Sequence, residues 1–176
     1  VNQALLVAET LRNTLTKYRI LTHCGGGSFK SQMKKADKTG AIIALILGQD
    51  EIAQHTVTVK WLQKGEQVTL PQTKLETASQ AASSYQKTQD AYQKLAVSPE
   101  DKTANTELQR EAQRLIQDYT TTPYALNASL LLAKRAMDNK DLKEAEKQLR
   151  WVLTQPVDDG VKSIATLRLA RLLVEK

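Results

Sequence analysis

Three glycines followed by a serine form the stretch whose residue types point most directly to chemistry. Gly25, Gly26 and Gly27 end a short apolar run, and Ser28 stands where a helix N-cap is expected. Free backbone N–H groups and the helix dipole at such a junction can bind phosphate. The alternative interpretation is a tight turn that binds no ligand.

Lysines mark one side of the helix expected after the glycines. Lys30, Lys34 and Lys38 are spaced at i, i+4 and i+8, with Lys35 beside them and Asp37 as the opposing acidic residue. This concentration of lysine favours contact with the phosphates of a polyanion. A solvated helix face would have the same composition, so both interpretations stay open.

Other reactive residues do not form a recognisable catalytic or metal site. Phe29 precedes the lysine-serine pair, so the Gly-Lys-Ser/Thr ending of a nucleotide-hydrolysing P-loop is missing. His23 and Cys24 are adjacent at an expected strand end, where neighbours point to opposite faces, and nothing places His55 near them. We therefore expect no catalytic residues, no metal site and no cofactor.

The elements that position the glycine loop follow from local patterns. Residues 2–16 form an amphipathic helix with Leu5, Ala8, Leu11 and Leu15 on its apolar side, and residues 19–21 read as a short strand. In the lysine-bearing helix we expect a buried face, and Gly40 then provides a left-handed stop. The residues of that expected buried face are Phe29, Met33 and Ala36.

Strand patterns complete the first part of the chain. The apolar run 41–47 has strand length, and residues 56–62 alternate β-branched and polar side chains. A turn at 64–66 leads to a second short strand, so residues 56–71 predict a β-hairpin. Phe29 and Trp61 could stack on unpaired bases or simply pack in the core.

Composition and charge restrict the class of protein. The chain has 176 residues, of which 41% are hydrophobic and 25% are charged, as in an ordinary folded protein of one or two domains. Residues 1–76 hold ten basic and six acidic side chains, which leaves 15 and 13 for the remainder. The basic excess therefore favours an acidic partner for the first part. The longest apolar run is too short for a membrane span, and the single Cys24 fits a reducing compartment.

The sequence changes character near residue 72. Glycine becomes rare, strand patterns end, and helix formers dominate between prolines, so this part is expected to be entirely helical. Helices are expected at 74–96, 103–119, 124–139, 141–154 and 161–175.

A short internal sequence similarity indicates helical repeats. Residues 128–134 match residues 165–171 at an offset of 37, close to the period of tetratricopeptide repeats. Ala133 and Ala145 have the spacing that lets two helices pack closely. The second copy leaves Ile164, Leu167 and Leu172 under-covered, which implies a further helix, a partner chain or a missing C-terminus. Self-association through this last helix is one form that such a partner can take.

Residues 2–75 resemble the C-terminal anticodon-binding domain of bacterial histidyl-tRNA synthetase. The motifs that support this are the triple glycine, FKSQMKKADKTGA, ALILG-x-DE-x-A and TVTVK. The resemblance implies a mixed sheet flanked by helices that binds the anticodon stem of histidine tRNA. The family's domain opens with a strand that is not in this sequence, and Trp61 replaces a usually acidic residue. The catalytic domain is missing, so at most the non-catalytic part of a ligase is implied.

Residues 79–176 are similar to the tetratricopeptide-like periplasmic domain of an ancillary Sec-translocon subunit. The similarity rests on ASSYQKTQDAYQKL, on YALNASLLLAKRAMDNKDLKEAEKQLRWVL and on ATLRLARLLVEK. It implies a protein-interaction module outside the cytoplasm, whereas the first resemblance implies a cytoplasmic protein. A fusion of two modules is therefore expected.

The combined interpretation is an α/β anticodon-binding-like module (residues 1–76) joined to an all-α tetratricopeptide-like module (residues 77–176). We expect the first to bind tRNA without catalysis in the cytoplasm and the second to bind a protein. The alternative is a translocon-ancillary or chaperone-like protein in which the first module is a passenger. The residues expected to contact tRNA are Gly25, Gly26, Gly27, Ser28, Lys30, Lys34, Lys35, Lys38, Gln49, Glu51 and Lys60.

Overall fold

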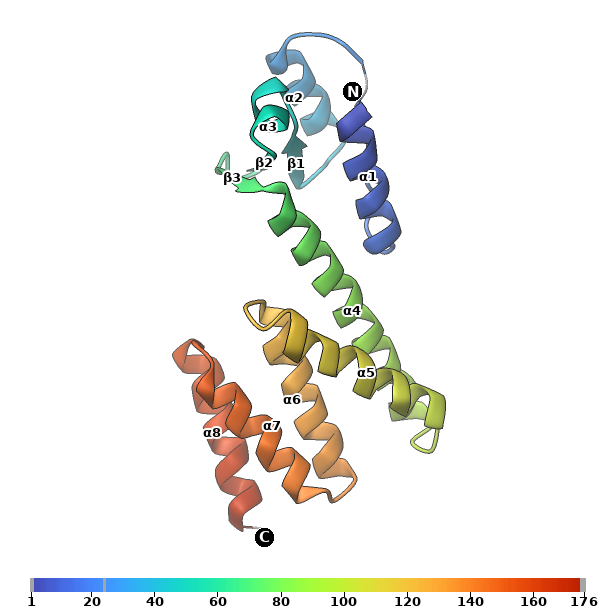
Figure 1. Cartoon of the computed structure of the whole chain (residues 1–176), viewed down its shortest axis with the longest axis vertical. Coiled ribbons are helices and arrows are strands. Elements are labelled where there is room, and N and C mark those ends of the chain that lie inside the picture. Colours follow the sequence, from blue (N-terminus) through green and yellow to red (C-terminus); the bar gives the residue numbers. More distant parts are fainter. Residues whose placement is uncertain (1, 24, 175–176) are drawn as a thin grey trace. The chain divides into compact units, whose positions relative to one another are not determined.

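The computed structural model describes residues 2–23 and 25–174, which form parts of two compact units. The N-terminal unit comprises Val1–Gln80 and the helical unit Ala81–Lys176 (Figure 1). Cys24, with the pairings considered for it, lies outside the described residues. The two units correspond to the α/β part and the all-α part expected from the sequence.

The N-terminal unit is built on a three-stranded antiparallel sheet in the order β1-β2-β3. The strands are β1 (Ile43–Ile46), β2 (Thr56–Trp61) and β3 (Gln67–Pro71). Leu45 pairs with Val59, which pairs in turn with Val68. The predicted hairpin is confirmed. The described strand pairs are all antiparallel, so they do not show the mixed arrangement that the resemblance implied.

The middle strand, β2, is covered on both faces. Val57 and Val59 are buried on one face, and Thr58 is buried on the other. The Thr58 hydroxyl lies 2.9 Å from the carboxylate of Glu51 and 2.7 Å from the Thr69 hydroxyl. A buried hydroxyl that is hydrogen-bonded carries no desolvation penalty, so this polar residue is compatible with the centre of the sheet.

The prediction of a strand at residues 19–21 is wrong, because this segment has no regular secondary structure. The guanidinium of Arg12, on α1 (Asn2–Thr14), donates two hydrogen bonds of 3.2 Å to the Ile20 carbonyl and one of 2.6 Å to the Thr22 hydroxyl. Arg12 therefore occupies the Ile20 carbonyl, which a neighbouring strand would otherwise use as a hydrogen-bond acceptor. The Leu21 side chain is 57% exposed.

Helix α1 buries fewer apolar residues than its amphipathic pattern predicts. Ala8 and Leu11 are buried, whereas Leu5 is 37% exposed and Leu15 is half-buried. At the start of α4 (Gln72–Val97), the Gln72 side chain donates to the Thr56 carbonyl at 3.0 Å, which ties the helix start to β2. The apolar side of α1 is thus only partly covered.

The helical unit follows the predicted segments closely. It contains the second part of α4, then α5 (Lys102–Asp118), α6 (Pro123–Asp138), α7 (Leu142–Thr154) and α8 (Asp159–Val174). Leu108, Ala112 and Leu115 of α5 are fully buried, as the helical spacing predicts. Glu111 is also buried, and its carboxylate accepts hydrogen bonds from the neighbouring Arg110.

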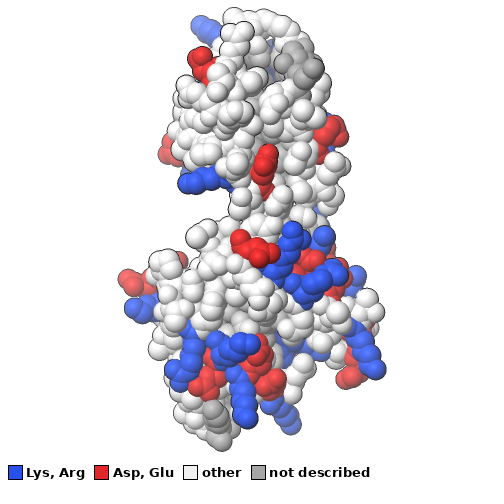
Figure 2. All heavy atoms as spheres, viewed as in Figure 1, with Lys and Arg blue, Asp and Glu red and all other residues white. Residues whose placement is uncertain are grey.

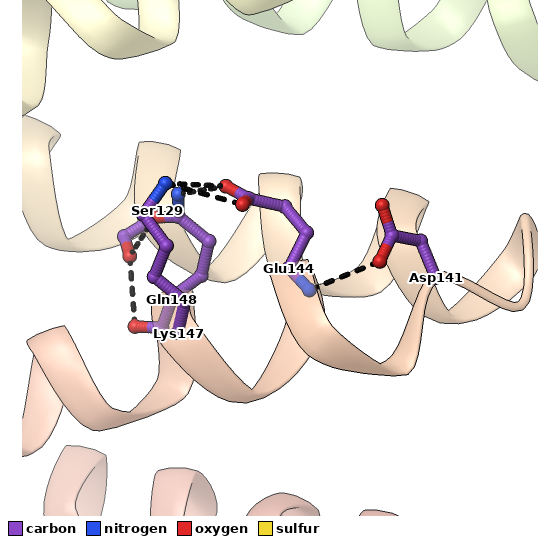
Figure 3. Close-up of polar contacts among 5 residues, drawn as sticks. All are labelled: Ser129, Asp141, Glu144, Lys147 and Gln148. Atoms are coloured by element: carbon purple, nitrogen blue, oxygen red, sulfur yellow. Dashed lines mark hydrogen bonds and ion pairs between the residues drawn. The ribbon is translucent and has the colours of Figure 1, made fainter.

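Helices α6 and α7 are joined by small residues and a buried polar contact. Ala133 and Ala145 are both almost fully buried in one core cluster, which confirms their expected role in close helix packing. The buried Ser129 hydroxyl donates to the Gln148 side-chain oxygen (2.8 Å) and main-chain oxygen (3.0 Å), and the Gln148 amide donates to Glu144 at 2.7 Å (Figure 3).

The last helix, α8, is covered on one side. Ala165, Leu169 and Leu172 are buried, so the expectation that Leu172 is under-covered is wrong. Ile164 and Leu167 are 49% and 73% exposed, as expected. Across residues 2–23 and 25–174, no helix combines the length and apolar character needed to cross a membrane.

The contact between Ser129 and Gln148 gives a stability prediction. Ser129→Ala leaves the buried Gln148 oxygen without its donor, so the free energy of unfolding should fall by roughly 1 to 3 kcal/mol. Urea unfolding followed by far-ultraviolet circular dichroism measures this change. Ser163→Ala is the matched control, because its hydroxyl bonds to the Asp159 carbonyl on an exposed surface. Equal losses for the two variants would contradict the importance of the buried contact.

Candidate nucleic-acid interface

The glycine loop leads into helix α2 (Phe29–Lys38) through a capped junction. The Ser28 hydroxyl accepts a hydrogen bond from the Ser31 N–H at 3.3 Å, and the Gln32 amide donates to the Gly27 carbonyl at 3.0 Å. Gly27 has φ +122°, a conformation that side-chain-bearing residues rarely adopt. The predicted loop, N-cap and helix are therefore confirmed as local structure.

The lysines of α2 are all exposed. In the part of the chain that the structure describes, no ion pair joins Lys30, Lys34, Lys35 or Lys38 to a carboxylate. Their ammonium groups are available to an external anion, and phosphate contacts of this kind fix a protein on nucleic acid without reading its sequence.

The prediction of a buried face on α2 is wrong, because none of the residues of this helix is buried. Phe29 is 55% exposed, and Met33 and Ala36 are half-buried. An exposed aromatic ring in the first turn, directly after the glycine loop, is available for stacking on a base. Trp61 is half-buried at the end of β2, paired with Ile43, which favours a packing role.

Basic residues of the helical unit are arranged differently from those of α2. On the face drawn in Figure 2, Lys and Arg of this unit are interleaved with Asp and Glu. Pairs within single helices account for part of this pattern, and such pairing weakens the attraction for a polyanion. The ion pairs are Arg110–Glu111, Arg114–Asp118, Lys147–Glu144 and Arg150–Glu146.

A short helix, α3 (Gln49–Ala53), occupies the segment that the sequence suggested as a polar loop. Glu51 accepts a hydrogen bond from the Gly48 N–H at 2.9 Å and another from the Thr58 hydroxyl at 2.9 Å. The bond from Thr58, with the backbone bonds, lowers the pKa of Glu51. Both carboxylate oxygens are engaged, so Glu51 fastens α3 to β2, and its role in tRNA contact stays a prediction.

Gln49 and Lys60 lie on this part of the sheet and its covering helix. Gln49 is the exposed first residue of α3, and Lys60 is half-buried in β2, opposite Ala44 and Gln67. Because side chains alternate along a strand, Lys60 shares the face of Thr58, which contacts α3 through Glu51. Glu51 and Lys60 thus belong to the same face of the sheet, and Gln49 is an exposed residue of the helix that Glu51 joins to this face. Their contact with tRNA stays a prediction.

The structural roles of two residues, Arg12 and Glu51, were missed by sequence reasoning. Arg12 fixes the segment leading to the glycine loop, and nothing in its sequence neighbourhood predicts contacts with Ile20 and Thr22. The capping role of Glu51 could have been found, because a glutamate three residues after an N-cap position is typical of a helix start.

One hollow in the described part of the N-terminal unit is too small for a typical small ligand. This hollow, between α1 and the start of α4, has a volume of about 80 Å³, well below the roughly 300 Å³ of a typical ligand pocket. Among the described residues there is also no group of three or more His, Cys, Asp or Glu that could hold a metal ion.

The two units define a chain with a small α/β domain and a helical-repeat domain. Residues 1–81 match the family described as an anticodon binding domain, and residues 70–176 match the family described as a tetratricopeptide repeat-like domain. The second match spans more than half of the chain, which belongs to the tetratricopeptide repeat-like family. Both segments inferred from the sequence motifs are confirmed at this level.

The contact between Glu51 and Thr58 gives a pH-dependent prediction. A lowered folded-state pKa means that ionised Glu51 stabilises the fold above its ordinary value of 4.5, and that this stabilisation is lost as the pH falls through the lowered value. Glu51→Gln should therefore destabilise β2 by roughly 1 kcal/mol at pH 7, and the difference should shrink in acid.

Hydrogen exchange of the β2 amides at pH 7 and below pH 4 measures this difference. Glu66→Gln, at an exposed hairpin position, is the control and should change little at either pH. A difference that grows in acid would contradict the assigned role of Glu51.

Proposed function

We propose that the N-terminal unit binds tRNA without catalysis and that histidine tRNA is its natural ligand. The observation that carries the proposal is a set of four exposed lysines on α2, none of which forms an ion pair with a carboxylate of the described residues. They lie next to a glycine loop, within a segment that matches an anticodon binding domain. Histidine tRNA is named because of the sequence resemblance alone.

The proposal assigns different contacts to different parts of the unit. Lysines of α2 and the N–H groups of the glycine loop meet phosphates, which positions the RNA. Phe29 stacks on an unpaired base, and Gln49 and Lys60 reach base edges from the sheet face that carries α3. This division matches the general pattern in which phosphate contacts position and base contacts specify.

The helical unit supplies the second half of the proposal, which is binding of a protein partner. Tetratricopeptide-like repeats present extended surfaces built from stacked helices, and such surfaces suit protein recognition. We assign residues 1–76 to tRNA binding and residues 77–176 to protein binding, in the cytoplasm where tRNA is found.

A salt titration of tRNA binding tests the first half. Changing Lys30, Lys34, Lys35 and Lys38 together to Gln should reduce the slope of log affinity against log salt by about 3, because each lost phosphate contact removes about 0.7 to 0.9. Histidine tRNA should also bind more tightly than the same tRNA with a swapped anticodon, in filter-binding or gel-shift assays.

The matched control removes the same charge from exposed lysines of the helical unit. It replaces Lys87, Lys94, Lys140 and Lys143 by Gln. A slope that responds equally to both sets would contradict binding through α2. Equal affinity for the two tRNAs would contradict anticodon recognition and would leave only non-specific RNA binding.

A second candidate function is favoured by the larger extent of the helical match. In this rival, the tetratricopeptide-like part acts with the protein translocon or with periplasmic chaperones, and the first module is a passenger. The rival predicts that the full chain binds purified translocon components or chaperones in biolayer interferometry. It also predicts that the fourfold lysine variant of α2 binds them equally well. Absence of binding to all of these proteins would exclude the rival and leave tRNA binding unaffected.

A further inference from the structure

Helix α2 carries four lysines but is not held in place by a core. None of its residues is buried, and its first residue, Phe29, is 55% exposed. Its C-terminal end is fixed because the chain enters the sheet soon after Gly40. There the Ile42 carbonyl accepts a hydrogen bond of 3.0 Å from the Leu62 N–H, and β1 follows directly. The position of the other end of α2 therefore depends on the segment that precedes it.

The segment that precedes α2 is fastened to α1 by the side chain of Arg12. After α1 the chain turns through a hydrogen bond of 3.0 Å from the Tyr18 N–H to the Leu15 carbonyl, and Ile20 and Thr22 then lie beside Arg12. The guanidinium donates to the Ile20 carbonyl through Nε and Nη2 and to the Thr22 hydroxyl through Nη2. We call these three hydrogen bonds the Arg12 latch.

The surroundings of Arg12 suit it to holding the chain and not to contacting RNA. Its Nη1 is paired with the Glu9 carboxylate, so each of the three guanidinium nitrogens already has an acceptor on the protein. Its side chain is only 33% exposed, whereas the four lysines of α2 are exposed. A planar guanidinium that bonds two acceptors fixes a geometry that an ammonium group cannot reproduce.

The latch shortens the free chain in front of α2. With the latch closed, the link between Thr22 and the helix cap at Ser28 is residues 23–27, whereas with the latch open it is residues 15–27. The effective concentration of a tethered binding group falls roughly as the −3/2 power of the link length. For an RNA that contacts α2 and the rest of the unit together, opening the latch therefore costs up to about fourfold in affinity.

We propose that Arg12 is a positioning residue for RNA binding. Its latch holds α2 where the lysines and the sheet face that carries α3 contact one RNA together. The three glycines after the latch still allow the helix to adjust to the bound RNA. This inference rests on the proposed tRNA-binding function and assigns a role in it to a basic residue that does not itself contact the RNA.

A salt titration of the full chain with a histidine tRNA transcript separates positioning from direct contact. Arg12→Met removes the donors but retains a straight side chain of good helix propensity. The Kd should rise about two- to fourfold at every salt concentration, and the slope of log affinity against log salt should not change. A phosphate contact made by Arg12 itself would instead reduce the slope by about 0.7 to 0.9. Arg12→Lys keeps the charge without the fork and should bind as weakly as Arg12→Met.

Two further variants complete the set. Arg19→Met is the matched control, because Arg19 is an exposed residue of the same segment and its loss removes the same charge. Thr22→Val removes one bond of the latch and preserves the side-chain shape, so it should weaken binding in the same direction but less. It also tests the latch if circular dichroism shows that Arg12→Met does not fold.

Nuclear magnetic resonance relaxation of the backbone amides observes the latch without RNA. In the free protein, Arg12→Met should lower the order parameters of α2 and leave those of β2 unchanged, whereas Arg19→Met should change neither. A change confined to α2 distinguishes positioning from a general loss of structure, which would also lower the order parameters of the sheet.

Three results in the titration would overturn the inference. They are native affinity for Arg12→Met, a slope that Arg12→Met lowers and Arg12→Lys restores, and an equal effect of Arg19→Met. The second would make Arg12 a direct phosphate contact. If the native chain binds no tRNA, the proposed function is wrong. Order parameters of α2 that are unchanged in Arg12→Met would overturn the latch whether or not tRNA binds.

Discussion

The close approach of α6 and α7 is the constraint on which the helical unit depends. Two alanines, Ala133 and Ala145, leave room for the helices to meet, and the buried hydroxyl of Ser129 then requires a partner at a defined position on α7. Apolar packing alone would tolerate small shifts between the helices. The hydrogen bonds of Gln148 with Ser129 and Glu144 restrict such shifts, because a displaced glutamine would be buried without partners.

In the N-terminal unit a comparable role belongs to Thr58. It is buried in the middle strand, and its hydroxyl connects β3 through Thr69 and α3 through Glu51. The apolar core of this unit is small, since Val57, Val59, Ala8 and Leu11 are its buried hydrophobic residues among those described. Polar contacts made by Arg12, Gln72 and Glu51 therefore hold several of its segments in place. A surface held in this way can present the lysines of α2 without burying that helix.

Sequence patterns predicted the regular elements well where periodicity was long. The helices of the repeat part and the hairpin were found because their apolar spacing extends over many residues and is bounded by proline or glycine. The short segments were less predictable. Residues 19–21 read as a strand, but a side chain 8 residues away takes the Ile20 carbonyl, and no local pattern encodes that contact. Phe29 was expected to be buried because it shares a helical spacing with Met33 and Ala36, although its exposure depends on whether another element covers α2. The row of lysines on α2 was visible from spacing, whereas the contacts of Glu51 depend on how α3 lies against β2.

The two tryptophans of the chain fall one in each unit, which has a practical meaning for thermodynamics. Trp61 is half-buried in β2 and Trp151 is half-buried in α7. Replacing either one by phenylalanine leaves a single intrinsic fluorophore that belongs to one unit only. The emission of each variant then follows one unit through denaturation, so a stability can be assigned to each unit within the intact polypeptide. Whether the two transitions coincide would show directly how far the units share cooperativity.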